Sequence, residues 1–452
     1  MIDPRTGEII KGQVTLGALR VRQDYLIAEG LLAPYAKGKD LSKKIHSFVL
    51  ARIRQLAAHE TGHTLGLAHN FAASVDNRAS VMDYPYPDVK IAKDGTLDVS
   101  SAYAVGIGAW DVQAIQYGYE QFPAGSDEHA GLDAIIQSGI SKGLHFLSDE
   151  AARPAGSASP VAHLWDNGGN AIDQLQYVMK VRAAALDHFG EGNIQTGMPL
   201  AHMEDVLVPL YMFHRYQVTA AAKLLGGVSY SYAVKGDGQP LPEIVKPAEQ
   251  RRALKALLAV IRPDALALPE NIRNHIPPQP NGYGRTREDF KGKTGLVFDA
   301  LAPAESAAEL TVGLILDPER DTRLEEYHAE HHDNPGLGEV IDALVASTWR
   351  GRDVAGYDGA IERHVNTIVL NHLMALANND NASEQVRAVA FTKIDELRQW
   401  MARRLSSTKD SDWKALYMYS LAKIKQYQEN PAKFKLPEPV TLPPGDPIGE
   451  WE

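Results

Sequence analysis

The sequence HETGHTLGLAH occupies residues 59–69, and the interpretation of the whole chain starts from it. On a helix, His59 and His63 lie one turn apart on the same face, so both imidazoles can reach a single ion. Gly66 lets the backbone turn away from the helix, which would bring His69 back to that ion as a third ligand. Three neutral imidazoles leave a fourth position open for water, as a catalytic zinc site requires.

Glu60 directly follows the first of these histidines. It would project beside the ion, where a carboxylate can take a proton from a metal-activated water molecule. The alternative is a histidine-rich helix end that binds no metal. Five fixed residues at these spacings arise by chance in about one of ten thousand sequences of this composition. The pattern therefore favours a metal site.

The residues before the motif predict the helix that the site requires. From Ser42 to about Leu65, apolar residues recur at steps of three and four and form one stripe. Its members are Ile45, Phe48, Val49, Ile53, Leu56 and Ala57. Gly66 then stands where a helix would end, because glycine adopts the left-handed conformation at low energy.

A second motif, SVMDYP, occupies residues 80–85. A pattern HExxHxxGxxH followed by a methionine-containing turn resembles the signature of the metzincin clan of zinc metalloproteases. The resemblance implies that the three histidines bind Zn²⁺, that Glu60 is the general base, and that Met82 forms an apolar floor beneath them. An unbranched thioether can pack closely under imidazoles without competing as a ligand. Without the first motif, Met82 would be interpreted as an ordinary core residue.

Two further residues can be compared with the residues at the matching positions in subfamilies of that clan. Tyr84 matches the tyrosine that astacin- and serralysin-like members place near the zinc, as a fifth ligand or as a donor to the oxyanion. The alternative is an aromatic residue of a surface turn. Asn70 follows the third histidine, where astacins have Glu, serralysins Pro, matrix metalloproteinases Ser and adamalysins Asp. This departure argues against all four subfamilies.

Other strings are similar to a bacterial group of large zinc-dependent metalloproteases. They are DPRTGEI at 3–9, LRVRQDYL at 19–26 and HLWDNG at 163–168. That group is usually exported, so the resemblance implies a periplasmic or extracellular location as part of a longer bacterial precursor. The first ten residues of this chain, MIDPRTGEII, do not have the pattern of a signal peptide.

The composition of the 452 residues is that of an ordinary globular protein, with 44% hydrophobic and 23% charged residues. Lys and Arg number 46 against 57 Asp and Glu, a net charge of −11. This balance argues against a nucleic-acid binder, and no apolar run reaches the roughly 20 residues of a membrane span. The chain has no cysteine, so any metal must be held by histidines and carboxylates.

We expect a predominantly α-helical protein of two or three domains, at about 150 residues each. Residues 1–125 would form a metzincin-like zinc region with the active-site helix, the Met-turn and short edge strands within 7–20. A loop-rich connection would span 126–169, a large helical domain 170–435, and a Pro-rich tail 436–452. The expected helices are 108–117, 170–190, 204–225, 247–261, 303–317, 338–349, 357–377, 383–405 and 411–428.

Metzincins build the upper wall of their cleft from a twisted sheet and a helix that precede the active-site helix. Here only residues 1–41 precede it. We therefore expect that the upstream part of the catalytic region is missing, and that an upstream domain of the same full-length protein is a possible partner. The chain would bind zinc but cleave peptides weakly, because an edge strand holds an extended substrate in place.

The sequence thus predicts a zinc-dependent metallopeptidase that hydrolyses peptide bonds of peptide or protein substrates. One alternative is a non-catalytic binding protein, or an inactive fragment, with a structural zinc site. A second is an enzyme that acts on something other than peptide, which clan resemblance alone argues against. His328, His331 and His332 could form a second metal site, but a solvated helix end fits them better. The segment 163–169 is interpreted as a structural corner rather than a substrate subsite.

Overall fold

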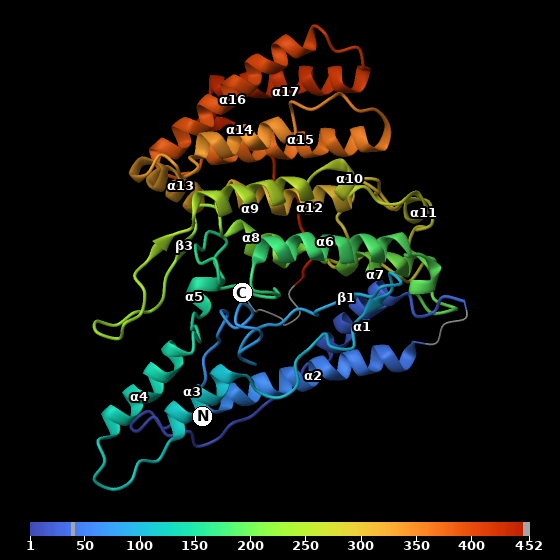
Figure 1. Ribbon diagram of the computed structural model, residues 1–452. Helices are drawn as coiled ribbons and strands as arrows, with labels where there is room; N and C mark the ends of the chain where they lie inside the picture. Colours follow the sequence, from blue (N-terminus) through green and yellow to red (C-terminus); the bar gives the residue numbers. More distant parts are fainter. Residues whose placement is uncertain (38–40, 446–452) are drawn as a thin grey trace.

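Helices dominate the computed structural model, which describes residues 1–37 and 41–445. Figure 1 shows them stacked in successive layers, from α2 (Ser42–Thr64) at one end to α16 (Glu384–Leu405) and α17 (Ser411–Glu429) at the other. The predicted α-helical class is confirmed. Strands in the described part of the chain form only two antiparallel pairs, β1 (Lys90–Ile91) with β2 (Leu97–Asp98) and β3 (Val228–Ser229) with β4 (Glu243–Ile244).

Helix α2 forms where the apolar stripe predicted it, and that stripe is buried at Ile45, Phe48, Val49 and Leu56. Its partner is α1 (Ala18–Leu32), which also packs on α7 (Met203–Tyr211). The strands predicted within residues 7–20 are wrong. Apart from the isolated bridge between Ile2 and Ile9, no strand forms in the described residues up to α1. Because α1 is covered by more than one helix, consecutive residues are buried and the sequence lacks a one-sided stripe.

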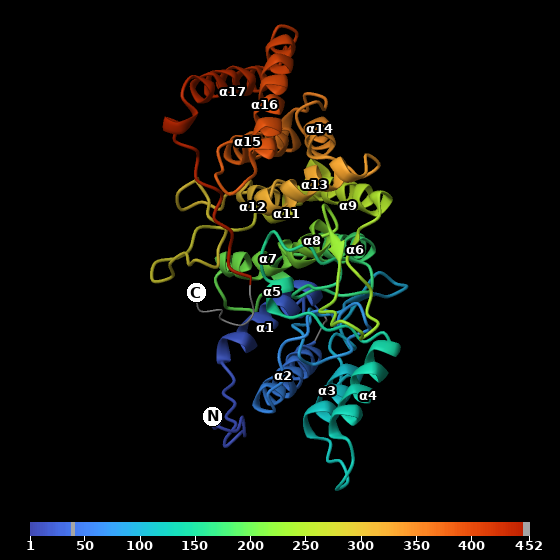
Figure 2. The ribbon, with the colours of Figure 1, turned by 90° about the vertical axis from the view of Figure 1, so that its left-hand side faces the viewer.

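Helices α3 (Ala109–Tyr119) and α4 (Glu128–Ser141) form an arm that projects from the stack (Figures 1 and 2). Helix α4 was not predicted within the loop-rich connection 126–169; Asp127 caps it by accepting a hydrogen bond from the amide of Ala130. This helix buries few residues, so its apolar periodicity is weak. A four-residue helix, α5 (Asp149–Ala152), lies in the same segment.

The helices predicted beyond residue 170 are confirmed, with one difference. The helix expected over 204–225 is two helices, α7 and α8 (Arg215–Ala222), because the chain turns at residues 212–214. The other confirmed helices are α6 (Ala171–Asp187), α9 (Pro247–Val260), α12 (Ala302–Ile315), α14 (Leu337–Ser347), α15 (Gly356–Ala377), α16 and α17. Helices outside the predicted ranges are α10 (Pro263–Leu266), α11 (Glu270–Arg273) and α13 (Pro318–Glu330), whose last turn holds the histidine-rich helix end expected near His328. Short 3-10 turns lie at Glu191–Asn193, Leu200–His202 and Pro431–Lys433.

One continuous hydrophobic cluster runs through the stack. It includes Phe48 of α2, Trp165, Leu207 of α7 and Val369 of α15. Helix α12 packs against α8, α9 and α15 and is therefore buried on nearly every side. The residues around the HETGHTLGLAH motif and the helical layers thus share a core, and the division into domains stays a prediction.

The chain returns from the far end of the stack to its middle. Residues 436–445 are extended and pass along the side of the molecule toward α8 and α1 (Figure 2). Arg215 donates to the carbonyl of Pro443, and Gln23 donates to the carbonyl of Gly445. The predicted Pro-rich tail is extended as far as residue 445, and its last residues, 446–452, lie outside the described part.

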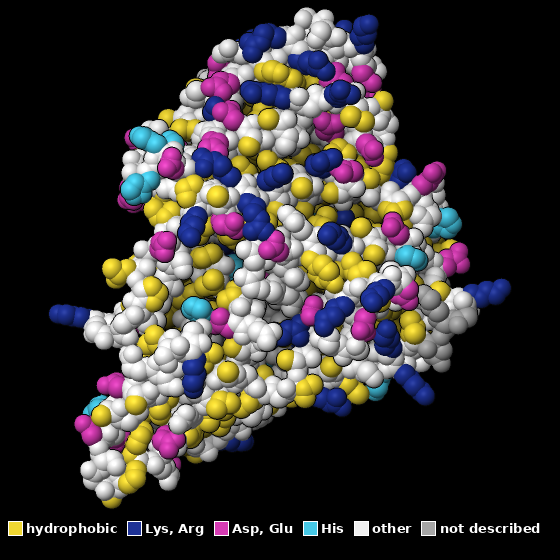
Figure 3. Space-filling model, viewed as in Figure 1, with side chains coloured by type: hydrophobic (Ala, Val, Ile, Leu, Met, Phe, Trp, Pro, Cys, Tyr) yellow, Lys and Arg dark blue, Asp and Glu magenta, His cyan; other side chains and the backbone are white. Residues whose placement is uncertain are grey.

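The surface mixes charge of both signs. On the face shown in Figure 3, Lys and Arg side chains are interspersed with Asp and Glu. That face has no broad basic area of the kind that phosphate backbones require. Among the described helices, none combines the length and the apolar character needed to cross a membrane.

Candidate metal centre

The end of α2 brings the first two histidines of the motif together. His59 and His63 are one turn apart, and their Nε2 atoms are separated by 3.1 Å. His59 lies on the buried side of the helix, whereas His63 is exposed. The helix therefore places one imidazole in the protein interior and the other toward solvent, with both rings directed at one point.

The turn at Gly66 brings in the third histidine. Gly66 has φ +85°, the left-handed conformation expected from the sequence. The amides of Leu65 and Leu67 both donate to the carbonyl of Gly62, which ends the helix and reverses the chain. His69 then lies with its Nε2 atom 3.1 Å from that of His63. Within residues 1–37 and 41–445, these three histidines are the one group of His and carboxylate ligands compact enough to hold an ion.

The opposite nitrogen of each imidazole is hydrogen-bonded to an oxygen. The Nδ1 partners are the carbonyl of Val81 for His59 at 2.7 Å, the carbonyl of Leu67 for His63 at 2.9 Å, and the carboxylate of Asp149 for His69 at 3.0 Å. Because these oxygens only accept, Nδ1 carries the proton in each ring and Nε2 has a free lone pair. Three lone pairs that point at one another repel, so the arrangement fits a cation between them.

The environment also keeps the imidazoles of His59 and His69 neutral, as metal ligands must be. Burial lowers the pKa of His59 to about 3. Burial also lowers the pKa of His69, against the opposing effect of its hydrogen bond to Asp149. Both rings therefore hold a free lone pair at neutral pH.

Met82 lies beneath the end of α2 and is fully buried. Its turn is held by Asp111, whose carboxylate accepts hydrogen bonds from the hydroxyl of Ser80 and from the amides of Val81 and Gly108. The carbonyl of Met82 accepts from the amide of Asn70, next to the third histidine. The predicted Met-turn residue is therefore tied directly to the loop that carries His69.

Tyr84 also lies at the centre. Its hydroxyl is 3.0 Å from Nε2 of His69, and its ring stacks on Trp165 with centroids 4.7 Å apart. Burial raises the pKa of Tyr84, so the hydroxyl keeps its proton at neutral pH. Trp165 is buried, and its amide donates to the carbonyl of Tyr84. This contact agrees with a structural role for the segment 163–169.

Glu60 is half-buried on α2, beside the histidines. Its negative charge is the smallest of the causes that raise the pKa of Tyr84, after burial and the charge of Asp149. Among the described residues, none donates a hydrogen bond to the Glu60 carboxylate. A carboxylate without protein donors can accept from water or from a substrate.

Sequence reasoning did not find Asp149 and Arg153, which contact the centre from a segment 80 residues beyond the motif. It named Asn70 only as a departure from known subfamilies. In the structure the Asn70 amide donates to the carbonyl of His145 and accepts from the amide of Leu147. Asn70 therefore ties the segment before Asp149 to the histidine loop, a role that no local pattern could reveal.

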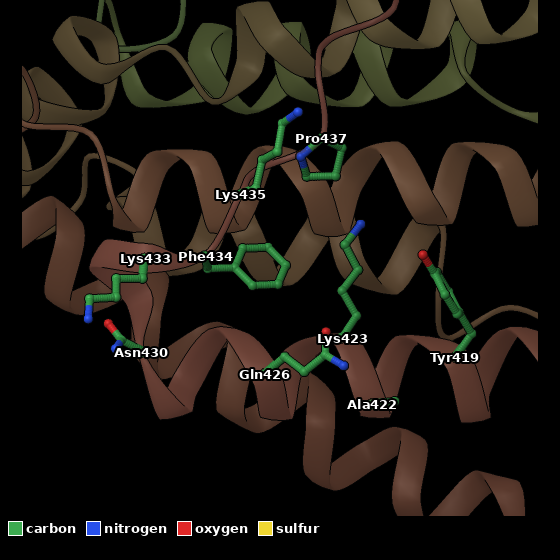
Figure 4. Close-up of a pocket in the computed structure, with 9 residues that line it drawn as sticks. All are labelled: Tyr419, Ala422, Lys423, Gln426, Asn430, Lys433, Phe434, Lys435 and Pro437. Atoms are coloured by element: carbon green, nitrogen blue, oxygen red, sulfur yellow. The ribbon is translucent and has the colours of Figure 1, made fainter.

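Other features of the chain do not form a comparable site. Nδ1 of His328 donates to the carbonyl of Asn334, and among the described residues its ring packs against that of His332 alone. A pocket of about 480 Å³ beside α17 is lined by Lys423, Lys433 and Lys435. Figure 4 shows their ammonium groups pointing in different directions, and that of Lys423 donates to Asn371. They do not converge on one anion.

Comparison with known proteins identifies one family. A family model described as Met-zincin matches residues 42–355, well over half of the chain. The match begins at the first residue of α2, includes the three histidines and Met82, and continues through the helical layers to the start of α15. No curated protein and no solved structure matches the chain.

Proposed function

The chain belongs to the Met-zincin family, and on that premise we propose that it is a zinc-dependent metallopeptidase that hydrolyses peptide bonds. The observation that carries the proposal is the convergence of three Nε2 atoms whose rings are each fixed through Nδ1. Three nitrogen ligands with a fourth position left open are typical of catalytic zinc.

His59, His63 and His69 would hold the zinc, with Met82 as the apolar floor below them. When bound, zinc supplies Lewis acidity to the scissile carbonyl and to the attacking water. Glu60 accepts the proton of that water at its carboxylate, because it lies beside the histidines and has no protein donor to compete. The hydroxyl of Tyr84, directed at the same point, donates a hydrogen bond to the oxyanion as the carbonyl becomes tetrahedral.

A non-catalytic protein with a structural zinc is the alternative. Such a site is normally closed by four protein ligands, whereas three side chains converge here. A structural zinc site also does not require a half-buried carboxylate such as that of Glu60, to which no described residue donates a hydrogen bond. Both features favour the enzyme.

Glu60→Gln tests the proposal. The amide keeps the size of the side chain but cannot accept the proton, so zinc content should stay at one per chain while hydrolysis falls by about 10² or more. Hydrolysis would be followed by mass spectrometry on a library of unstructured peptides. Glu326→Gln on the exposed side of α13 is the control. Equal turnover by Glu60→Gln and the wild-type chain would remove Glu60 from the mechanism.

The assay must be sensitive, because we expect slow cleavage. Each described strand is only two residues long. An extended substrate held by strand addition needs a longer edge, so its backbone would be positioned poorly. Fast, Glu60-dependent cleavage by this chain would contradict that expectation without affecting the role of Glu60.

A further inference from the structure

Two charged residues of the α5 segment contact the candidate metal centre from outside the motif. The Asp149 carboxylate lies 3.0 Å from Nδ1 of His69. Arg153 donates from Nε to the same carboxylate and from Nη2 to the hydroxyl of Tyr84, at 3.2 Å for the second contact. Its guanidinium also lies over the Tyr84 ring, 5.4 Å from the centroid. One ion pair thus contacts both His69 and the tyrosine beside it.

The position of His69 depends on such a contact more than the positions of His59 and His63 do. His59 and His63 are placed by a long helix, whereas His69 is on the loop after it. A carboxylate on Nδ1 fixes the orientation of a ligating imidazole and increases the basicity of its other nitrogen. The same carboxylate also accepts a hydrogen bond from Nε of Arg153, so the acceptor of His69 is itself held in place.

The α5 helix has only four residues and cannot position this ion pair by itself. The buried Lys223, directly after α8, donates to the carbonyls of Ala152 and Ala162 at 2.6 and 2.7 Å. These carbonyls lie on either side of the loop that follows α5. A buried ammonium that loses its acceptors is strongly unfavourable, so this contact holds the loop firmly.

Two arginines of helix α13 bind the same loop at two further backbone carbonyls. The fully buried Arg320 donates to the carbonyl of Ala155 at 2.8 Å, and Arg323 donates to that of Gly156 at 2.7 Å. Three basic side chains from the helical layers therefore bind backbone carbonyls between residues 152 and 162, directly beside Arg153.

We propose that Asp149 and Arg153 are positioning residues of the metal centre, and that Lys223, Arg320 and Arg323 make the helical layers a structural part of it. The proposal rests on the proposed function for the identity of the ion. It predicts that a change at Lys223, remote from the histidine motif in sequence, weakens metal binding through α5. The helical layers would then stabilise the position of the three histidines, in addition to any function of their own.

The first test measures metal binding by the full chain, without an activity assay. Zinc affinity is measured by chelator competition, and the visible absorption of the cobalt-loaded protein reports the ligand geometry. Asp149→Asn should weaken zinc binding by about 10- to 100-fold and alter the cobalt spectrum. Asp205→Asn is the matched control, since Asp205 makes an equivalent pair with His202 on the 3-10 turn before α7, 2.8 Å from its Nδ1. The control should bind zinc like the wild type.

The second test asks whether Lys223 acts through Asp149. Lys223→Met should weaken zinc binding in the wild-type background but add little to Asp149→Ala, because the two changes remove one support. Should Lys223→Met fail to fold, the milder Arg323→Met takes its place. Exposed Lys180→Met on α6 is the control.

Each result bears on a separate claim. If the wild-type chain binds no zinc, the proposed function is wrong. If it binds zinc and Asp149→Asn binds it equally well with an unchanged cobalt spectrum, the positioning role is wrong. If the effects of Lys223→Met and Asp149→Ala on affinity multiply, the link through the helical layers is wrong.

Discussion

Gly62 faces the sulfur of Met82 so closely that a Cβ atom at position 62 would lie 2.2 Å from Sδ and 3.3 Å from Cε. Met82 is fully buried, and Gly62 lies on the buried side of α2, between His59 and His63. The methionine therefore occupies the space directly under the helix turn that carries both ligands. Only a residue without a side chain permits this contact.

Gly62→Ala should consequently weaken both the fold and the metal centre. Alanine favours a helix by up to about 1 kcal/mol over glycine, but here its methyl group must displace Met82, and such overpacking destabilises by about 1–3 kcal/mol. We expect a lower unfolding temperature and weaker zinc binding in chelator competition. Gly118→Ala in α3 is the control, since nothing lies within 4 Å of its added Cβ. If Gly62→Ala bound zinc like the wild type, the packing argument would be wrong.

His63→Ala should abolish stoichiometric zinc binding, because two imidazoles form a poor site. The exposed ring of His63 contributes little to the core, so the variant should keep the helical circular dichroism spectrum of the wild type. Metal analysis after gel filtration gives the result directly. His129→Ala on the exposed face of α4 should retain one zinc per chain. Full occupancy in His63→Ala would mean that the metal binds elsewhere.

Tyr84→Phe should keep zinc and fold while peptide hydrolysis falls. The phenyl ring preserves the stacking on Trp165, and only the hydroxyl near His69 is lost. Removal of one oxyanion donor lowers kcat by roughly 10²-fold, with little change in KM. Steady-state kinetics on the best peptide substrate measure this, with the exposed Tyr419→Phe as control. Unchanged kcat would leave Tyr84 a structural residue.

Acid should destabilise the fold in part through His163. Burial and, to a smaller extent, the positive charge of Lys223 lower the pKa of His163 to about 3. Its Nε2 donates to the carbonyl of Pro160 at 2.9 Å. Since the unfolded chain binds this proton near pH 6.5, the stabilising contribution is complete above pH 6.5 and is lost as pH falls toward 3. The expected slope is up to about 1.4 kcal/mol per pH unit.

His163→Gln isolates this effect, because the amide can still donate to Pro160 but takes up no proton. Its free energy of unfolding in urea should fall less steeply than that of the wild type between pH 6.5 and 5. Excess chelator in every sample keeps the chain free of metal, so that proton uptake on metal release does not contribute to the measured slope. His129→Gln should follow the wild-type slope, and an equally steep slope for His163→Gln would refute the assignment.

The long helix, the turn and the three histidines could be predicted from the sequence because they depend on neighbours along the chain. An apolar stripe at steps of three and four is enough to form α2, and helix geometry then places His59 and His63 on one face. Gly66 adopts the conformation that its missing side chain allows. The amphipathic helices beyond residue 170 were predicted for the same reason.

The sequence by itself therefore determined the three candidate ligands and the helix that carries two of them, while tertiary structure decided what supports them. Helix α1 was missed because it is covered by more than one helix, which removes the periodic signal. The contacts of Asp149 with His69 and of Lys223 with Ala152 join residues about 70 to 80 positions apart. A hydrogen bond between distant segments leaves no periodicity or spacing in either one, so only the folded chain shows that the helical layers hold the loop beside the metal centre.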